Sequence, residues 1–217
     1  MRTVAVGLWA LLCAASAWAQ MPSLPVLEKG LRVGIGWNTF IGADAERIGG
    51  RLGPSIGVFA AVELLPEIAL QPELLYSRRT AVQEIVLGAG GYDLEYDLAY
   101  LELGLPLRLR REVAGYTMYG LLGPVLALRL SGKLNQRIGG GTPIAQRAEF
   151  ATFDVRGLLA VGTELPLRRS ARLFVDARLG VGALPVFASE FKPPLREEKP
   201  LQKLQLLSAG VSVGFGF

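Results

Sequence analysis

Acidic side chains are the residues of this chain whose types come closest to suggesting catalysis. The 217 residues include no histidine, so the most common general base and the most common metal ligand are both absent. Glu73 and Glu102 fall on neighbouring predicted strands and are the best candidates for an acid–base pair. Neutralisation of each by an inward arginine is the commoner arrangement for such groups. We therefore expect a protein that is not an enzyme and that binds no cofactor or metal.

Glycine and cysteine residues do not provide a binding motif either. Gly139, Gly140 and Gly141 form a run, but no Lys-Ser/Thr follows it, so it predicts a flexible outer loop rather than a phosphate site. Cys13 is the single cysteine and falls in the export signal described next, which leaves the mature chain without disulfides or cysteine metal sites. The 23 Lys+Arg are spread along the chain without a basic stripe, which argues against nucleic-acid binding.

The first residues predict export. Arg2 supplies a positive start, residues 4–15 are apolar and uncharged, and residues 17–19 read Ala-Trp-Ala, a small-x-small cleavage pattern. We therefore predict a signal peptide over residues 1–19, followed by a short tail over 20–29 and one domain over 30–217. The alternative, a lipoprotein acylated at Cys13, has Leu12 where a small residue is expected.

Alternating apolar and polar residues dominate the rest of the chain. This period of two places successive side chains on opposite faces of a strand. It runs through eight segments, over residues 31–38, 55–64, 68–77, 101–110, 117–131, 153–165, 172–181 and 207–217. Residues 92, 94, 96 and 98 are apolar on the opposite parity, which predicts a bulge near Ala99 that resets the faces.

The longest uncharged stretch, residues 113–128, is too short for a spanning helix and contains Gly123-Pro124. Only helices and closed barrels satisfy all backbone groups in lipid. The fold predicted is therefore all-β: an eight-stranded antiparallel up-and-down transmembrane β-barrel. Connections alternate between short ones, near residues 65–67, 111–115 and 166–170, and long ones, over 41–54, 79–91, 134–149 and 188–203. This asymmetry is typical of outer-membrane barrels, with short periplasmic turns and longer outer loops. Residues 30–217 are therefore predicted to be an outer-membrane β-barrel domain, and residues 20–29 a short periplasmic tail.

Charged residues share one face of these segments with glycines, and the other face is almost wholly apolar. Seven arginines turned to lipid would cost ~2–4 kcal/mol each at mid-membrane, or roughly 14–28 kcal/mol together, more than the ~5–15 kcal/mol of a whole fold. We therefore expect a salt-bridged lumen too narrow for an open pore. Its predicted members are Arg32, Glu63, Glu73, Glu102, Arg108, Arg110, Arg129, Asp154, Arg156, Glu164, Arg172, Asp176 and Arg178. The alternative is a soluble, lipocalin-like periplasmic carrier, which would turn its polar face outward.

Aromatic residues Trp37, Tyr92, Tyr96 and Tyr100 predict girdles at the membrane interface, with a binding stripe as the alternative. The loop over 192–200, which contains three prolines and several charges, is expected to be solvated. Its alternative role is contact with a partner or with lipopolysaccharide phosphates.

Four blocks of the chain resemble the PorT-like family of outer-membrane β-barrel proteins. They are residues 68–79 (IALQPELLYSRR), 100–110 (YLELGLPLRLR), 119–133 (YGLLGPVLALRLSGK) and 173–184 (LFVDARLGVGAL). Together they span nearly all of the mature chain, although Gly104 stands at a usual proline position and Thr80-Ala81 where a glycine is usual. The resemblance implies an eight-stranded barrel, and one branch of the family is linked to type IX secretion. An accessory role in secretion or assembly is therefore kept as an alternative to a structural or interaction role through the outer loops.

The C-terminal strand, with Val213, Phe215 and Phe217, resembles the signal by which the barrel-assembly machinery recognises its clients. Such a strand pairs with an exposed sheet edge while its aromatic residues fill pockets. The partners expected are therefore this machinery and periplasmic chaperones during biogenesis, and outer-membrane lipid and lipopolysaccharide afterwards. We expect a monomer in the cell outer membrane.

Overall fold

A computed structural model describes residues 26–43, 45, 48–87, 90–138, 141–146, 148–167, 171–188 and 204–217. The predicted signal peptide, residues 1–19, lies outside these ranges. Regular structure in the described residues consists of β-strands in one antiparallel sheet. None of the described elements is a helix that is both long and apolar enough to cross a bilayer.

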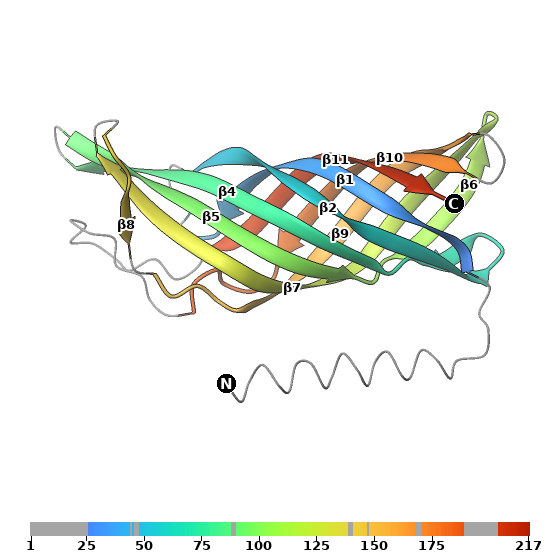
Figure 1. Cartoon of the computed structure of the whole chain (residues 1–217), viewed down its shortest axis with the longest axis horizontal. Coiled ribbons are helices and arrows are strands. Elements are labelled where there is room, and N and C mark those ends of the chain that lie inside the picture. The colour runs from blue at the N-terminus through green and yellow to red at the C-terminus, as the bar shows by residue number, and fades with distance from the viewer. Residues whose placement is uncertain are drawn as a thin grey trace.

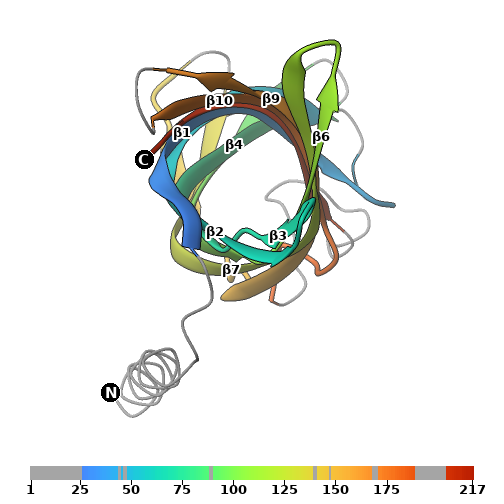
Figure 2. The same ribbon diagram turned by 90° about the vertical axis from the view of Figure 1, so that its right-hand side faces the viewer.

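The sheet has eleven strands and closes on itself. The strands are β1 (Val26–Ile41), β2 (Ile48–Leu65), β3 (Ile68–Leu70), β4 (Glu73–Leu87), β5 (Gly90–Gly104), β6 (Leu107–Val113), β7 (Tyr116–Ile138), β8 (Ile144–Gln146), β9 (Phe153–Pro166), β10 (Arg172–Gly182) and β11 (Gln205–Gly216). From β1 the pairing runs through β11, β10, β9, β7, β5, β4 and β2, and β2 pairs with β1 again. Figure 2 shows the resulting cylinder from one end. First and last strands are joined by a register of twelve residue pairs from Gly30–Gly216 to Ile41–Gln205.

Eleven strands exceed the eight predicted, and two of the additional breaks fall at prolines. Pro72 stands between β3 and β4, and Pro106 between β5 and β6. Proline has no N–H to donate to a ladder and interrupts regular pairing. The chain keeps its course across the breaks, because Gln71 N–H donates to the Pro106 carbonyl at 2.9 Å and Ala60 N–H to the Pro72 carbonyl at 3.0 Å. The eleventh strand, β8, is a short addition beside β7.

The cylinder has two unlike ends (Figure 1). The short-turn end carries the β2–β3 turn, the β6–β7 turn and Phe217, as the short connections predicted. At the β6–β7 turn, Ala114 and Gly115 both have positive φ, of 52° and 83°, which favours glycine. At the opposite, long-strand end, β4, β5 and β7 extend beyond the other strands.

Three of the predicted long loops are wrong in their extent. Residues 48–54 of the predicted loop over 41–54 are strand, because β2 begins at Ile48. Residues 79–91 are almost entirely strand, because β4 continues to Leu87 and β5 begins at Gly90. Residues 134–149 contain the end of β7 and all of β8. Most of the predicted loop over 188–203 lies outside the described residues. β1 begins at Val26, four residues before the expected domain boundary at residue 30.

The bulge predicted near Ala99 exists, but its extra residue lies in the neighbouring strand. The register between β5 and β7 shifts between Ala99 and Tyr100, and Leu130 of β7 is left unpaired. The faces are therefore reset in β7 and not in β5. As a result, even-numbered residues of β5 from 92 to 102 all point into the cylinder.

This corrects the prediction of aromatic girdles. Tyr92, Tyr96 and Tyr100 are buried inside the cylinder, with exposures of 4%, 1% and 3%, whereas Trp37 is 43% exposed on its outer wall. The tyrosines help to form an apolar cluster that fills the long-strand end. Its other members include Phe40, Ile85, Leu94, Leu98, Leu134, Phe150, Phe187, Leu204 and Leu206. Edge-to-face contact of Phe40 with Tyr96 at 4.9 Å and stacking of Phe150 on Phe187 at 5.4 Å hold it together.

Candidate functional site

The interior of the cylinder below the apolar cluster is polar and charged, and it is the candidate site. Alternation along each strand turns one side chain in two toward the axis. On β9, for example, Asp154 and Arg156 are buried, whereas Val155 and Leu159 between and beyond them are exposed. The outer wall at this level is a continuous apolar band contributed by β1, β2, β4, β6, β7, β9, β10 and β11.

The sidedness of the sheet inverts at the level of Trp37 and Tyr76. In the part of β4 nearest the short-turn end, Glu73 points inward and Leu74 outward. Further along the strand, the charged residues Arg78 and Glu84 point outward. Along the same stretch Ala81 and Ile85 point inward. β5 changes in the same way: Leu103 is exposed and Glu102 buried, whereas Leu94 is buried and Asp93 and Glu95 face out.

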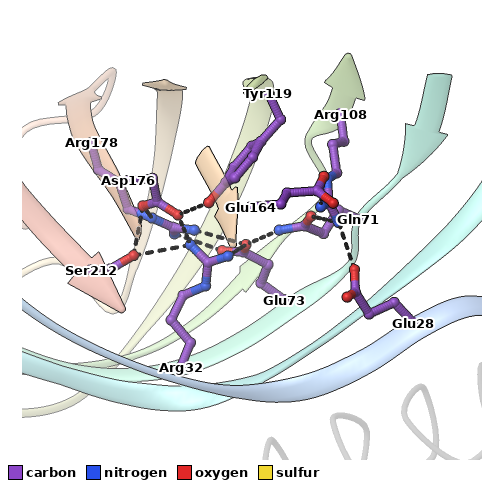
Figure 3. A network of polar contacts seen from close by, with 10 residues as sticks. All are labelled: Glu28, Arg32, Gln71, Glu73, Arg108, Tyr119, Glu164, Asp176, Arg178 and Ser212. Atoms are coloured by element: carbon purple, nitrogen blue, oxygen red, sulfur yellow. Dashed lines mark hydrogen bonds and ion pairs between the residues drawn. The ribbon is translucent and has the colours of Figure 1, made fainter. Parts of the chain in front are cut away.

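A first group of side chains, the middle network, lies around Arg32 (Figure 3). It consists of Arg32, Glu73, Tyr119, Asp176, Arg178 and Ser212. Arg32 Nη1 donates to Asp176 at 2.5 Å and to Ser212 at 3.0 Å. Arg178 bridges both acids, with Nη1 at 2.7 Å from Glu73 and Nε at 2.7 Å from Asp176. Each acid therefore has two arginine partners inside the cylinder.

A second group, the rim network, surrounds Arg108 nearer the short-turn end. Arg108 pairs with Glu164 and, at 3.0 Å, with Glu28. Its guanidinium also lies 4.8 Å from the Tyr119 ring centre and 4.7 Å from that of Phe174, a cation–π arrangement that favours a desolvated arginine. Gln71 connects the rim and middle networks, because it accepts from Arg108 at 3.2 Å and donates to Glu73 at 2.6 Å.

A third group, the upper network, lies below the apolar cluster around Glu102. Arg79 and Arg156 pair with this carboxylate at 2.9 Å and 2.7 Å, and Ser77 donates to it. Arg156 Nε also donates to Asp154 at 2.7 Å, and its guanidinium lies 4.5 Å from the Tyr100 ring centre. The interior acids of all three networks are thus matched by arginines, which is the condition for holding charge away from water.

Eleven of the thirteen predicted lumen residues form ion pairs in these networks. Arg110 and Arg172 do so at the rim, where both pair with Glu164. The other two lie elsewhere. Arg129 donates to the carbonyls of Ala151 and Phe150 at 3.0 Å. Glu63 forms no ion pair with any described residue and lies where the β2–β3 register shifts.

Six members of the networks are not among the predicted lumen charges: Glu28, Gln71, Ser77, Arg79, Tyr119 and Ser212. Alternation in the sequence places four of them, Gln71, Ser77, Tyr119 and Ser212, on the polar face of their strands, but the prediction named only charged residues. Arg79 keeps the parity of Glu73 and Ser77, but it was assigned to a loop. Glu28 was assigned to the tail over residues 20–29, whereas it lies in β1.

The proposed alternative of an acid–base pair between Glu73 and Glu102 finds no geometric support. Glu73 forms ion pairs with Arg178 and Arg32 of the middle network and accepts a hydrogen bond from Gln71. Glu102 bonds to a separate set of partners in the upper network. A cavity of about 70 Å³ lies between the two networks and is lined by both acids, Arg32, Arg79, Arg156 and Arg178. Among the described residues, no group of three or more acidic, cysteine or histidine side chains is arranged to hold a metal ion.

Glycines make room for the large charged side chains, and Gly162 of β9 gives a test of how tightly the lumen is filled. A Cβ at Gly162 would lie 2.6 Å from Asp176 Cβ and 2.8 Å from Tyr119 Cζ. We predict that Gly162→Val lowers the free energy of unfolding by ~1–3 kcal/mol through overpacking. Gly157→Val is the matched control on the same strand, because a Cβ there meets nothing within 4 Å. Urea titration in lipid vesicles measures both, and equal stability of the two variants would contradict a filled lumen.

The predicted assembly signal lies on the outer wall of β11. Val213, Phe215 and Phe217 are exposed there, with the two phenylalanine ring centres 6.2 Å apart. β11 is paired along its length with both β1 and β10. The aromatic side chains are therefore presented at the short-turn end while the backbone of the strand is fully paired.

No protein-family model matches the chain, and no curated protein matches it. Solved structures with a similar arrangement are outer-membrane β-barrel proteins. OprG from Pseudomonas aeruginosa is 10% identical with a TM-score of 0.46, over 88% of this chain and 95% of that chain. Ail, the attachment invasion locus protein of Yersinia pestis, solved with the heparin analogue sucrose octasulfate, is 10% identical with a TM-score of 0.40, over 88% and 98%. Neisserial surface protein A is 12% identical with a TM-score of 0.39, over 85% and 96%. At such identities and scores we infer nothing about this chain from the likeness.

Proposed function

We propose that this chain is an integral outer-membrane β-barrel protein with a plugged lumen. The observation that carries the proposal is the inversion of sidedness at Trp37 and Tyr76. Charged residues point inward and apolar residues outward on one side of that level. On the other side, β4 and β5 turn mainly apolar residues inward and most of their charged residues outward. A single strand such as β5 changes its pattern without changing its geometry, so the change must come from what surrounds it. Hydrocarbon around the apolar band and water around the long-strand end account for the two patterns.

The proposed barrel has eight transmembrane strands. β3 and β4 count as one of them, because they follow each other along the same neighbouring strand and are interrupted only at Pro72. β5 and β6 count as another for the same reason, with the interruption at Pro106. With β8 counted as an addition to β7, the closed part of the cylinder is formed by eight such strands. An interior of this width is just filled by side chains, which agrees with the three networks and the apolar cluster.

The height of the apolar band supports the assignment. On β11 the outward residues run from Leu207 to Phe217, which is about 34 Å along the strand at ~3.4 Å per residue. A strand tilt of ~40° reduces this to roughly 26 Å along the barrel axis, close to the ~25 Å band of outer-membrane barrels. A soluble monomer seldom exposes a contiguous apolar patch of more than a few hundred Å². The lipocalin-like alternative therefore loses its support, since it needs the opposite sidedness.

We propose a structural or interaction role, exerted from the long-strand end, and no catalysis. The three networks leave the interior acids paired with arginine, and the apolar cluster fills the lumen above them. The outer wall of the long-strand end carries two ion pairs, Arg78 with Asp97 at 2.5 Å and Arg137 with Glu95 at 3.3 Å. This polar surface is suited to water, lipopolysaccharide headgroups or a protein. An accessory role in a type IX-like secretion or assembly system is the second candidate, and it rests on the PorT-like blocks of the sequence.

The experiment that tests the proposal is gel migration of the detergent-extracted full chain before and after boiling. A closed membrane barrel resists the gel detergent until it is heated, so we expect two bands that interconvert on boiling and no release from membranes by salt or alkali. A single band at both temperatures, with release into plain buffer, would contradict the membrane barrel. Deletion followed by a secretion assay separates the two roles, since only the accessory role predicts loss of secretion.

A further inference from the structure

An apolar groove on the outer wall lies near the short-turn end. Its volume is about 580 Å³, and its lining includes Leu65, Ile68, Leu109, Gly120 and Val161. The registers place four of these residues in one row across neighbouring strands, because Ile68 pairs with Leu109, Leu109 with Gly120, and Gly120 with Val161. Leu109 and Val161 are more than half exposed. The large side chains of Leu109 and Val161 thus project from the outer wall on either side of Gly120, which has no side chain.

Gly120 forms the floor of the groove. A Cβ at this position would have a single neighbour within 4 Å, the Ala160 carbonyl oxygen at 3.7 Å. Glycine is therefore not required there by crowding of the backbone, and a larger side chain fits outward without a clash. What its presence does is keep the groove open between Leu109 and Val161.

Charged groups stand at the end of the groove that lies toward the turns. Arg110, Arg111 and Glu67 are all among the lining residues. Arg110 is partly engaged with Glu164 at 3.2 Å, whereas Arg111 is exposed and forms no ion pair with any described residue. A guanidinium is well suited to a phosphate oxygen, and Glu67 is suited to an ammonium group.

We propose that this groove binds a phosphatidylethanolamine molecule of the periplasmic leaflet. One acyl chain lies over Gly120 between Leu109 and Val161, Arg111 holds the phosphate and Glu67 faces the amine. The inference rests on the proposed membrane location, which puts the groove in hydrocarbon and its charged end at headgroup level. Charge complementarity at that end favours this zwitterionic headgroup over an uncharged lipid.

Native mass spectrometry of the full chain in a mild detergent, with added dioleoyl phosphatidylethanolamine, tests the proposal. We expect the wild type to retain one lipid under activation that strips dioleoylglycerol, which has the same chains without the headgroup. Gly120→Leu fills the groove and is expected to lower the lipid-bound fraction severalfold. Gly157→Leu also adds a side chain to the outer wall, where a Cβ meets nothing within 4 Å, and is expected to behave as the wild type.

Arg111→Gln provides a variant that leaves the groove and the barrel wall unchanged. It is expected to reduce retention of phosphatidylethanolamine to the level of dioleoylglycerol. Retention of annular lipid only, with no difference between the two lipids or between the Gly120 and Gly157 variants, would overturn the proposal. Heat-dependent migration of each variant is measured first, so that failure to form a membrane barrel is distinguished from failure to bind the lipid.

Discussion

Asp176→Ala is expected to lower the free energy of unfolding by about 3–5 kcal/mol, the cost of breaking a buried ion pair by removing one partner. Asp176 accepts hydrogen bonds from Arg32, Arg178, Tyr119 and Ser212. Without it, Arg32 is left with Glu73 at 3.7 Å as its remaining ion-pair partner among the described residues. The Arg32 side chain is 2% exposed, so water cannot easily replace the lost carboxylate.

Urea unfolding in lipid vesicles, followed through the fluorescence of Trp37, measures this loss. Asp97→Ala is the matched control. Asp97 also pairs with an arginine at 2.5 Å, but this arginine, Arg78, is 53% exposed on the outer wall of the long-strand end. Exposed pairs of this kind contribute ~0–1 kcal/mol. Similar small losses for both variants would mean that water fills the lumen and solvates its charges, which would refute the packed networks described above.

Leu159→Arg is expected to destabilise the barrel by ~2–4 kcal/mol in a bilayer, since its position near the middle of the apolar band faces hydrocarbon. Leu159 is 54% exposed and is flanked on the neighbouring strands by Leu122 and Leu179. The same exposure in a soluble protein would make the substitution almost neutral. The sign and size of the effect therefore distinguish the surroundings of the outer wall.

Val86→Arg is the control for this substitution. Val86 is 48% exposed on the outer wall of β4, beyond the level of Trp37 and Tyr76. We expect a cost of ~0–1 kcal/mol there, because charged residues are tolerated near and beyond the interface. Equal effects at the two positions, measured by the same unfolding titration, would argue against a lipid boundary between them.

Alternation in the sequence was sufficient to predict which residues turn inward over most of the apolar band. On β9 and β10 the burial of Asp154, Arg156 and Asp176 follows directly from the period of two. The same pattern could not locate the bulge between β5 and β7. A reversal of apolar parity arises either from an extra residue in the strand or from a change of solvent, and one strand's sequence does not distinguish them. In β5 the solvent changes and the geometry does not, which is why Tyr92 and Tyr96 were assigned to the wrong face.

Strand length was the other property that the sequence obscured. Beyond Tyr76, β4 continues with polar residues on its outer face and apolar ones inside, a pattern that resembles a loop when an apolar outer face is expected. Arg79 was therefore assigned to a loop and left out of the predicted lumen residues. Contacts between residues far apart in the sequence, such as Arg108 with Glu28, 80 residues apart, depend on the closure of the cylinder. Alternation along single strands could not identify such partners.

Spin-label accessibility along β9 tests the central claim most directly. In single-cysteine variants of the full chain in lipid vesicles, labels at positions 155, 157, 159 and 161 are predicted to collide with oxygen dissolved in the bilayer and to be shielded from a water-soluble nickel complex. Labels at positions 158 and 160, whose native side chains are buried, are predicted to be shielded from both. Ready access of the nickel complex to the odd-numbered positions would contradict an outer wall embedded in lipid.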